Sequence, residues 1–188
     1  MLRGESTPNY FSNPFAASRM AALMPEARCV VLLRDPIERA ISWMLHLKRL
    51  QGLSGDLESL LSKELMAMAD LEPDALMDQG NIFTRGLQDS CYDRALQHWL
   101  QYFPGEQVLL ISSERLFSNP AEELAAVLAF LGLPEDVCAL MPNWQHLNRN
   151  PRPAIQISAD LRRELFSFFS RHSQRALSRF QDQVVPLF

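Results

Sequence analysis

The chain alternates between short apolar runs and longer segments with helical periodicity. Residues 28–34, RCVVLLR, form a nearly continuous aliphatic run, which is typical of a strand buried on both faces of a parallel sheet. Asp35, Pro36 and Glu38 follow directly and combine an N-cap, a proline at the first helical position and a capping-box acid. The pattern therefore predicts a strand, a tight turn and an amphipathic helix that ends near Gly52.

The same criteria predict the other elements. Asn119, Pro120 and Glu122 repeat the combination of cap, proline and acid, and Gly132 ends that helix. Glycine and proline mark the breaks between segments. In chain order we expect a helix over 56–70, an irregular segment over 71–88, a helix from 90 to 103, a strand over 107–111, a helix over 120–131, a loop over 141–157 and a last helix that carries Leu161, Leu165, Phe168 and Phe169. Two strands among several helices predict an α/β fold with a small parallel sheet.

Composition narrows the class of protein. A chain of 188 residues that is 47% hydrophobic and 21% charged is typical of one soluble globular domain. Its longest aliphatic run is far shorter than the roughly 20 residues that cross a bilayer, and its first residues lack the apolar core of a signal peptide. We therefore expect no membrane span and a cytoplasmic location.

Cysteine and histidine show no pattern of metal ligands or disulfides. The three cysteines are odd in number and lie 62 and 47 residues apart, which fits neither a disulfide framework nor a zinc site, so a reducing compartment is favoured. The four histidines are scattered without ligand spacing, and we predict no metal. These residues are Cys29, Cys91, Cys138, His46, His98, His146 and His172.

Charge is unevenly distributed along the chain. The net charge is −4, but residues 1–148 carry 11 basic and 19 acidic side chains (−8), whereas residues 149–188 carry 7 and 3 (+4). All seven basic residues of the tail are arginines. A solvated helix face is the favoured interpretation, and an anion-binding surface is the alternative.

Arg34 is the first candidate for a binding residue. Ligands of open parallel sheets bind beyond the carboxyl ends of strands, and Arg34 follows a strand directly, beside the start of a helix. Its planar guanidinium suits a phosphate, and Ser42, two turns into the helix, could donate to the same group. The spacing alone leaves open a second interpretation, in which Arg34 pairs with Asp35 or Glu38 and Ser42 is an ordinary helix residue.

A family resemblance favours the first interpretation. LRDPIERAISWM at 33–44 resembles the 3′-phosphate-binding motif of the sulfotransferases that use 3′-phosphoadenylyl sulfate. GESTPNYF at 4–11, the segment at 85–120 and FLGLP at 130–134 are similar to further blocks of that family. The bacterial relatives of the heparan-sulfate sulfotransferases are the most similar branch. The resemblance implies a parallel sheet of the P-loop NTPase type flanked by helices.

The resemblance also implies roles for particular residues. Arg34 and Ser42 occupy its phosphate-binding positions, and Glu5 is an auxiliary group near the acceptor. Asn148, Arg149 and Arg152 lie on a late loop that approaches the nucleotide in the family, although a plain polar loop is an equal alternative.

Two departures from the family pattern concern the donor site. The amino-terminal strand and phosphate loop have no counterpart here, and Ser6 stands where a lysine is common. The segment that usually holds the general base is absent as well, so no catalytic base is named.

The function implied by the resemblance is transfer of a sulfuryl group from 3′-phosphoadenylyl sulfate to a hydroxyl or amine acceptor, with a saccharide among the candidate acceptors. We expect residues 1–188 to form a single sulfotransferase domain truncated at its start, which supplies the 3′-phosphate half-site and, alone, is aggregation-prone or needs a partner. Donor and acceptor are the expected partners, with no nucleic acid.

Two other functions stay open. A catalytically inactive remnant could bind a nucleotide or a partner protein. A P-loop kinase fragment shares the topology but does not explain the joint spacing of GESTPNYF, LRDPIERAIS and YFPGEQ.

Overall fold

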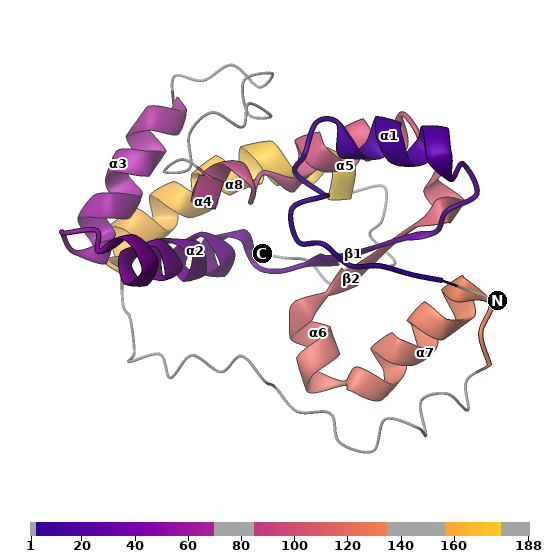
Figure 1. Ribbon diagram of the computed structural model, residues 1–188. Coiled ribbons are helices and arrows are strands. Elements are labelled where there is room, and N and C mark those ends of the chain that lie inside the picture. The colour runs from indigo at the N-terminus through magenta and orange to yellow at the C-terminus, as the bar shows by residue number, and fades with distance from the viewer. Residues whose placement is uncertain (1–2, 70–84, 135–156, 178–188) are drawn as a thin grey trace.

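The computed structural model describes residues 3–69, 85–134 and 157–177, and Figure 1 shows how their elements are arranged. Two parallel strands, β1 (Cys29–Leu33) and β2 (Val108–Ser112), form the described sheet. Their register runs from Cys29 opposite Val108 to Leu33 opposite Ser112. The helices are α1 (Ala16–Leu23), α2 (Pro36–Gln51), α3 (Leu57–Ala69), α4 (Arg85–Gln88), α5 (Tyr92–Leu100), α6 (Ser113–Ser118), α7 (Pro120–Leu131) and α8 (Ala159–Leu177), with the 3-10 turn η2 (Gly105–Gln107) before β2. The α/β class and the parallel pairing are confirmed.

The expectation that the first strand is buried on both faces is wrong. Cys29 and Leu33 are buried, but Val30 is 40% exposed and Leu32 is 52% exposed. Helices α1 and α5 cover one face of both strands, whereas α6 and α7 pack on β2 at the opposite side (Figure 1). The second face of β1 therefore keeps an apolar surface in the described part of the chain.

Local capping explains where the longer helices begin and end. The Asp35 side chain accepts a hydrogen bond from the Glu38 N–H at 2.8 Å, and Gly52 ends α2 in the left-handed conformation with φ of 63°. Gly132 ends α7 in the same way with φ of 71°. Both helices end in a left-handed backbone conformation that glycine adopts readily and that residues with a side chain rarely adopt. Asn119 is the N-cap of α7 and Pro120 lies in its first turn, as predicted, but the Asn119 side chain donates to Glu122 and does not cap a backbone N–H.

The hydrophobic pattern did not predict three short helices. Helix α4 lies inside the segment predicted to be irregular, and α1 and α6 were not expected at all. One or two turns contain too few apolar positions to reveal a period of 3.6 residues. Helix α5 also begins at Tyr92 and not at position 90.

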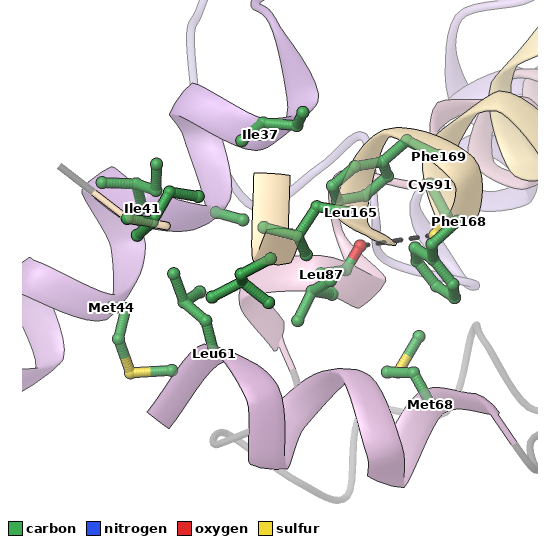
Figure 2. Close-up of a cluster of buried hydrophobic side chains, with 13 residues drawn as sticks. Ile37, Ile41, Met44, Leu61, Met68, Leu87, Cys91, Leu165, Phe168 and Phe169 are labelled. Carbon is green, nitrogen blue, oxygen red and sulfur yellow. Dashed lines mark hydrogen bonds between the residues drawn. The ribbon is translucent and has the colours of Figure 1, made fainter. Parts of the chain in front are cut away.

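Two hydrophobic cores lie side by side. The sheet core combines one face of the strands with α1 and α5 and includes Cys29, Leu33, Leu96, Trp99, Phe103, Val108 and Leu110. The helical core is formed by α2, α3, α4 and α8 and is shown in Figure 2. There Leu165, Phe168 and Phe169 of α8 surround Leu87 of α4, with Leu61 and Met68 of α3 beneath. The predicted core positions Leu161, Leu165, Phe168 and Phe169 are all buried, and each contributes roughly 1.5–3 kcal/mol by leaving water.

Within the residues that the structure describes, no helix has both the length and the apolar character required to span a membrane. The buried Cys29 and Cys91 are free thiols, and burial raises the pKa of both, that of Cys29 to about 11. They therefore pack as small apolar residues. Cys138 lies outside the described residues.

Candidate functional site at the strand ends

Two strand-to-helix turns meet at one edge of the sheet. Leu33 pairs with Ser112 at the ends of β1 and β2, so the residues that follow each strand are neighbours. The first turn carries Arg34 and Asp35, and the second carries Glu114 in the first turn of α6. The carboxyl edge of a parallel sheet is where such folds bind ligands.

The peptide unit between Arg34 and Asp35 is held at both of its polar atoms. The Tyr92 hydroxyl donates to the Arg34 carbonyl oxygen at 2.9 Å. The Asp35 N–H donates to Glu114 Oε1 at 3.1 Å. Tyr92 is only 3% exposed, and burial is the main cause that raises its pKa to about 12, so the phenol stays a hydrogen-bond donor at neutral pH. The backbone around Arg34 is therefore fixed by two elements remote in sequence.

The backbone donors at the start of α2 are already used. Glu114 accepts from the Asp35 N–H, Pro36 has no N–H, and the Asp35 carboxylate accepts from Glu38. Burial raises the pKa of Asp35, and the nearby Glu38 and Glu114 charges raise it further, against the backbone N–H groups of Glu38 and Ile37. An anion at this turn would thus be recognised by side chains. The sequence suggested that the N-terminus of this helix helps to bind the anion, and the structure does not support that contribution.

Arg34 and Ser42 take the places that the sequence predicted for them. Arg34 is half-buried directly after β1. Ser42 is half-buried on α2, about 9 Å along the helix axis from Pro36 at 1.5 Å per residue. It lies one turn beyond Glu38 and Arg39, on the same side of the helix. Their joint contact with a ligand stays a prediction.

The remaining predicted residues divide into two groups. Glu5 is exposed and accepts a hydrogen bond from the Tyr10 hydroxyl, within its own segment. Asn148, Arg149 and Arg152 lie outside the described residues.

Sequence reasoning missed Arg39. Its guanidinium donates to the Gly86 carbonyl at 3.3 Å and to Ser90 Oγ at 3.1 Å, and it pairs with Asp89 at 3.5 Å. It also acts to lower the pKa of Tyr92. Arg39 therefore joins α2 to the segment that leads into α5, close to the Arg34 turn. Its spacing from Arg34 gave no signal, because its partners are about 50 residues away in sequence.

Sequence reasoning also missed Glu114. The available signal was its position just after the second predicted strand, where side chains reach the ligand edge of the sheet.

Two arginines in the first part of α8 lie on a solvated face, as predicted. Arg162 pairs with Glu38 at 3.1 Å, and Arg163 pairs with Asp160. Both are exposed. Across the described residues, no group of histidine, cysteine or acidic side chains is arranged to hold a metal ion.

Comparison with known proteins identifies the class of protein to which this chain belongs. Residues 4–173 match the family model of the sulfotransferase domain. The chain therefore belongs to the sulfotransferase family.

Several characterised relatives share part of the chain. It is 36% identical over 129 residues to heparan sulfate glucosamine 3-O-sulfotransferase 3B1 from Homo sapiens, covering 69% of this chain and 30% of that protein. It is 32% identical over 136 residues to bifunctional heparan sulfate N-deacetylase/N-sulfotransferase 2 from Bos taurus, covering 69% of this chain and 14% of that protein. The chain thus spans less than a third of these relatives.

A solved sulfotransferase from Alicyclobacillus acidocaldarius shares the fold. It superposes with a TM-score of 0.70 at 24% identity, over 97% of this chain and 65% of that one. The described elements therefore adopt a sulfotransferase fold, with a two-stranded parallel sheet.

Proposed function

We propose that this chain provides the 3′-phosphate half of the donor site in a sulfotransferase that uses 3′-phosphoadenylyl sulfate, with Arg34 and Ser42 as the phosphate ligands. The observation that carries the proposal is the β1–α2 turn. An arginine stands at the carboxyl end of a strand, and its following peptide unit is held by Tyr92 and Glu114. A cation on a backbone held in this way is suited to bind a charged ligand with little loss of backbone freedom.

The electrostatics of the turn support an arginine as the main ligand. Asp35, Glu38 and Glu114 place three carboxylates near the turn, which would repel a phosphate. The backbone N–H groups that could offset this are used in the capping contacts. A guanidinium supplies both charge and two parallel donors, and the Ser42 hydroxyl adds a neutral donor.

The reaction we propose is transfer of a sulfuryl group to a hydroxyl or amine. The acceptor oxygen or nitrogen forms a bond to sulfur while the bond from sulfur to the donor phosphate oxygen breaks, and the acceptor proton passes to a base. Adenosine 3′,5′-bisphosphate leaves. The relatives named as a heparan sulfate glucosamine 3-O-sulfotransferase and a heparan sulfate N-deacetylase/N-sulfotransferase support a saccharide acceptor. In this scheme Arg34 and Ser42 orient the donor, and positioning supplies much of the rate gain.

We further propose that residues 1–188 form one sulfotransferase domain that handles the 3′-phosphate end of the donor. Asn148, Arg149 and Arg152 are proposed as additional nucleotide contacts and Glu5 as an acceptor contact. The phosphosulfate end and the general base are assigned to no residue of this chain.

The test is calorimetric binding of adenosine 3′,5′-bisphosphate, with 5′-AMP as the ligand that lacks the 3′-phosphate. Arg34→Ala should weaken binding of the bisphosphate by roughly 30- to 100-fold, and Ser42→Ala by up to about tenfold. Neither should change 5′-AMP binding. Arg49→Ala is the matched control, because Arg49 is exposed at the far end of the same helix.

Two outcomes would contradict the proposal. Folded wild type that binds both nucleotides equally does not recognise the 3′-phosphate. Folded wild type that binds neither is the remnant without donor chemistry.

A further inference from the structure

We infer that Glu114 is a positioning residue for the donor, which orients Arg34 toward the 3′-phosphate through the Asp35 N–H. The inference rests on the proposed function. It assigns to the β2–α6 turn a role in nucleotide selectivity, although Glu114 itself touches no phosphate in this scheme.

Both carboxylate oxygens of Glu114 are engaged. Oε2 accepts from Ser112 Oγ at 3.0 Å within its own turn, and Oε1 accepts from the Asp35 N–H at 3.1 Å, 79 residues away in sequence. Ser112 is 2% exposed and its Oγ also accepts from the Arg115 N–H at 3.4 Å, which caps α6. The Glu114 side chain is therefore anchored on a rigid turn before it reaches across to the other strand end.

The consequence for Arg34 follows from peptide planarity. The Arg34 carbonyl and the Asp35 N–H belong to one rigid unit. Tyr92 holds the oxygen and Glu114 holds the nitrogen. With both atoms held, rotation about the Arg34 Cα–C bond is restricted, and the direction in which its side chain leaves the backbone is set. Loss of the Glu114 contact would release one of the two restraints.

The charge of Glu114 has the opposite effect on an anion. A carboxylate near the turn repels a phosphate. Glu114 therefore weakens phosphate binding unless its contact with the Asp35 N–H strengthens that binding by more. Positioning and charge therefore predict opposite results for two conservative variants. Glu114→Gln removes the charge but keeps an oxygen that can accept from Asp35. Glu114→Asp keeps the charge but is one methylene too short to reach.

The experiment compares these two variants with wild type by calorimetry, using adenosine 3′,5′-bisphosphate and 5′-AMP. We expect Glu114→Asp to weaken bisphosphate binding by about tenfold and Glu114→Gln to stay within about threefold of wild type. Binding of 5′-AMP should be the same in all three proteins, which a general loss of structure would not allow. Glu106→Ala is the control, because Glu106 is exposed at the opposite end of β2, in η2.

The outcomes separate this inference from the proposed function. If wild type selects the bisphosphate but Glu114→Asp binds like wild type, or both variants lose affinity equally, Glu114 does not act through Asp35 and only this inference is overturned. If wild type shows no preference for the bisphosphate, the proposed function is overturned and the inference with it.

Discussion

Two glutamates perform the same task in two different regions of the molecule. At the strand ends, Glu114 accepts from the Asp35 N–H and uses its second oxygen for Ser112. In the helical core, Glu64 of α3 accepts from the Leu87 N–H of α4 at 2.8 Å. Glu114 is exposed, whereas Glu64 is 4% exposed and its Oε2 has no hydrogen-bond partner among the described residues. One contact is made in water and the other in an apolar core.

The difference shows which region can carry charge. Burial raises the pKa of Glu64 to about 7, against the lowering effect of the Leu87 and Gly86 N–H groups and of Arg39. Asp89 adds to the rise. The exposed carboxylate of Glu114 stays in contact with water, whereas a charge on Glu64 in the core loses its hydration. The helical core therefore has a stability that depends on pH.

The largest expected effect is the pH dependence that Glu64 imposes. Its folded-state pKa of about 7 lies above the ordinary 4.5, so the folded chain holds this proton more tightly than the unfolded chain. The contribution of Glu64 to the free energy of unfolding should fall as pH rises above about 4.5, continue to fall through 7 and then level off, by about 3 kcal/mol in total. Glu64→Gln removes this term, and denaturant unfolding from about pH 4 to about pH 9 measures it.

Glu114→Gln is the matched control for that measurement, because the same substitution lies at the water-exposed edge. Parallel pH profiles for wild type and Glu64→Gln would show that Glu64 does not titrate in the folded range.

A second way to test the helical core is Gly86→Ala. A Cβ at Gly86 would lie 3.0 Å from Glu64 Oε2 and 3.0 Å from Trp43 Cδ1. We expect a loss of about 1–3 kcal/mol in the free energy of unfolding, because α3 and α4 must move apart. Gly105→Ala, where the added atom meets nothing within 4 Å, should change stability far less. Equal losses for the two variants would contradict the close packing at Gly86.

At the strand ends a smaller effect is expected from Ser112→Ala. The variant loses the cap of α6 and the anchor of Glu114, at a cost of about 1 kcal/mol. Ser118→Ala, at the exposed end of the same helix, should cost less. Thermal unfolding of both would decide, and a larger loss at Ser118 would argue against the cap.

The smallest effect on stability is expected on the exposed face of β1. Threonine at both Val30 and Leu32 keeps the strand preference and should change the free energy of unfolding by no more than about 0.5 kcal/mol each. It should nevertheless reduce aggregation, because these side chains form an apolar surface. Light scattering during storage would measure this, and unchanged aggregation would place the cause elsewhere.

The amino-acid sequence by itself determined the features that depend on neighbouring residues. The run at 28–34, the cap at Asp35 with Pro36 and the stop at Gly52 predicted β1 and α2 closely. Arg34 therefore stands at a strand end in the prediction and in the structure alike. The spacing of apolar residues likewise predicted which side chains of α8 are buried. Capping hydrogen bonds and side-chain periodicity depend on residues that are close in sequence, so the sequence alone predicts them.

Only the tertiary structure decided the contacts that join distant segments. The hold on the Arg34 peptide unit comes from Tyr92 and Glu114, which are 58 and 79 residues from their partners. The burial of Glu64 and its bond to Leu87 depend on how α3 packs against α4. The open face of β1 depends on which helices cover the sheet. No local pattern specifies these features, because the free energy of a contact is set by what surrounds it in space.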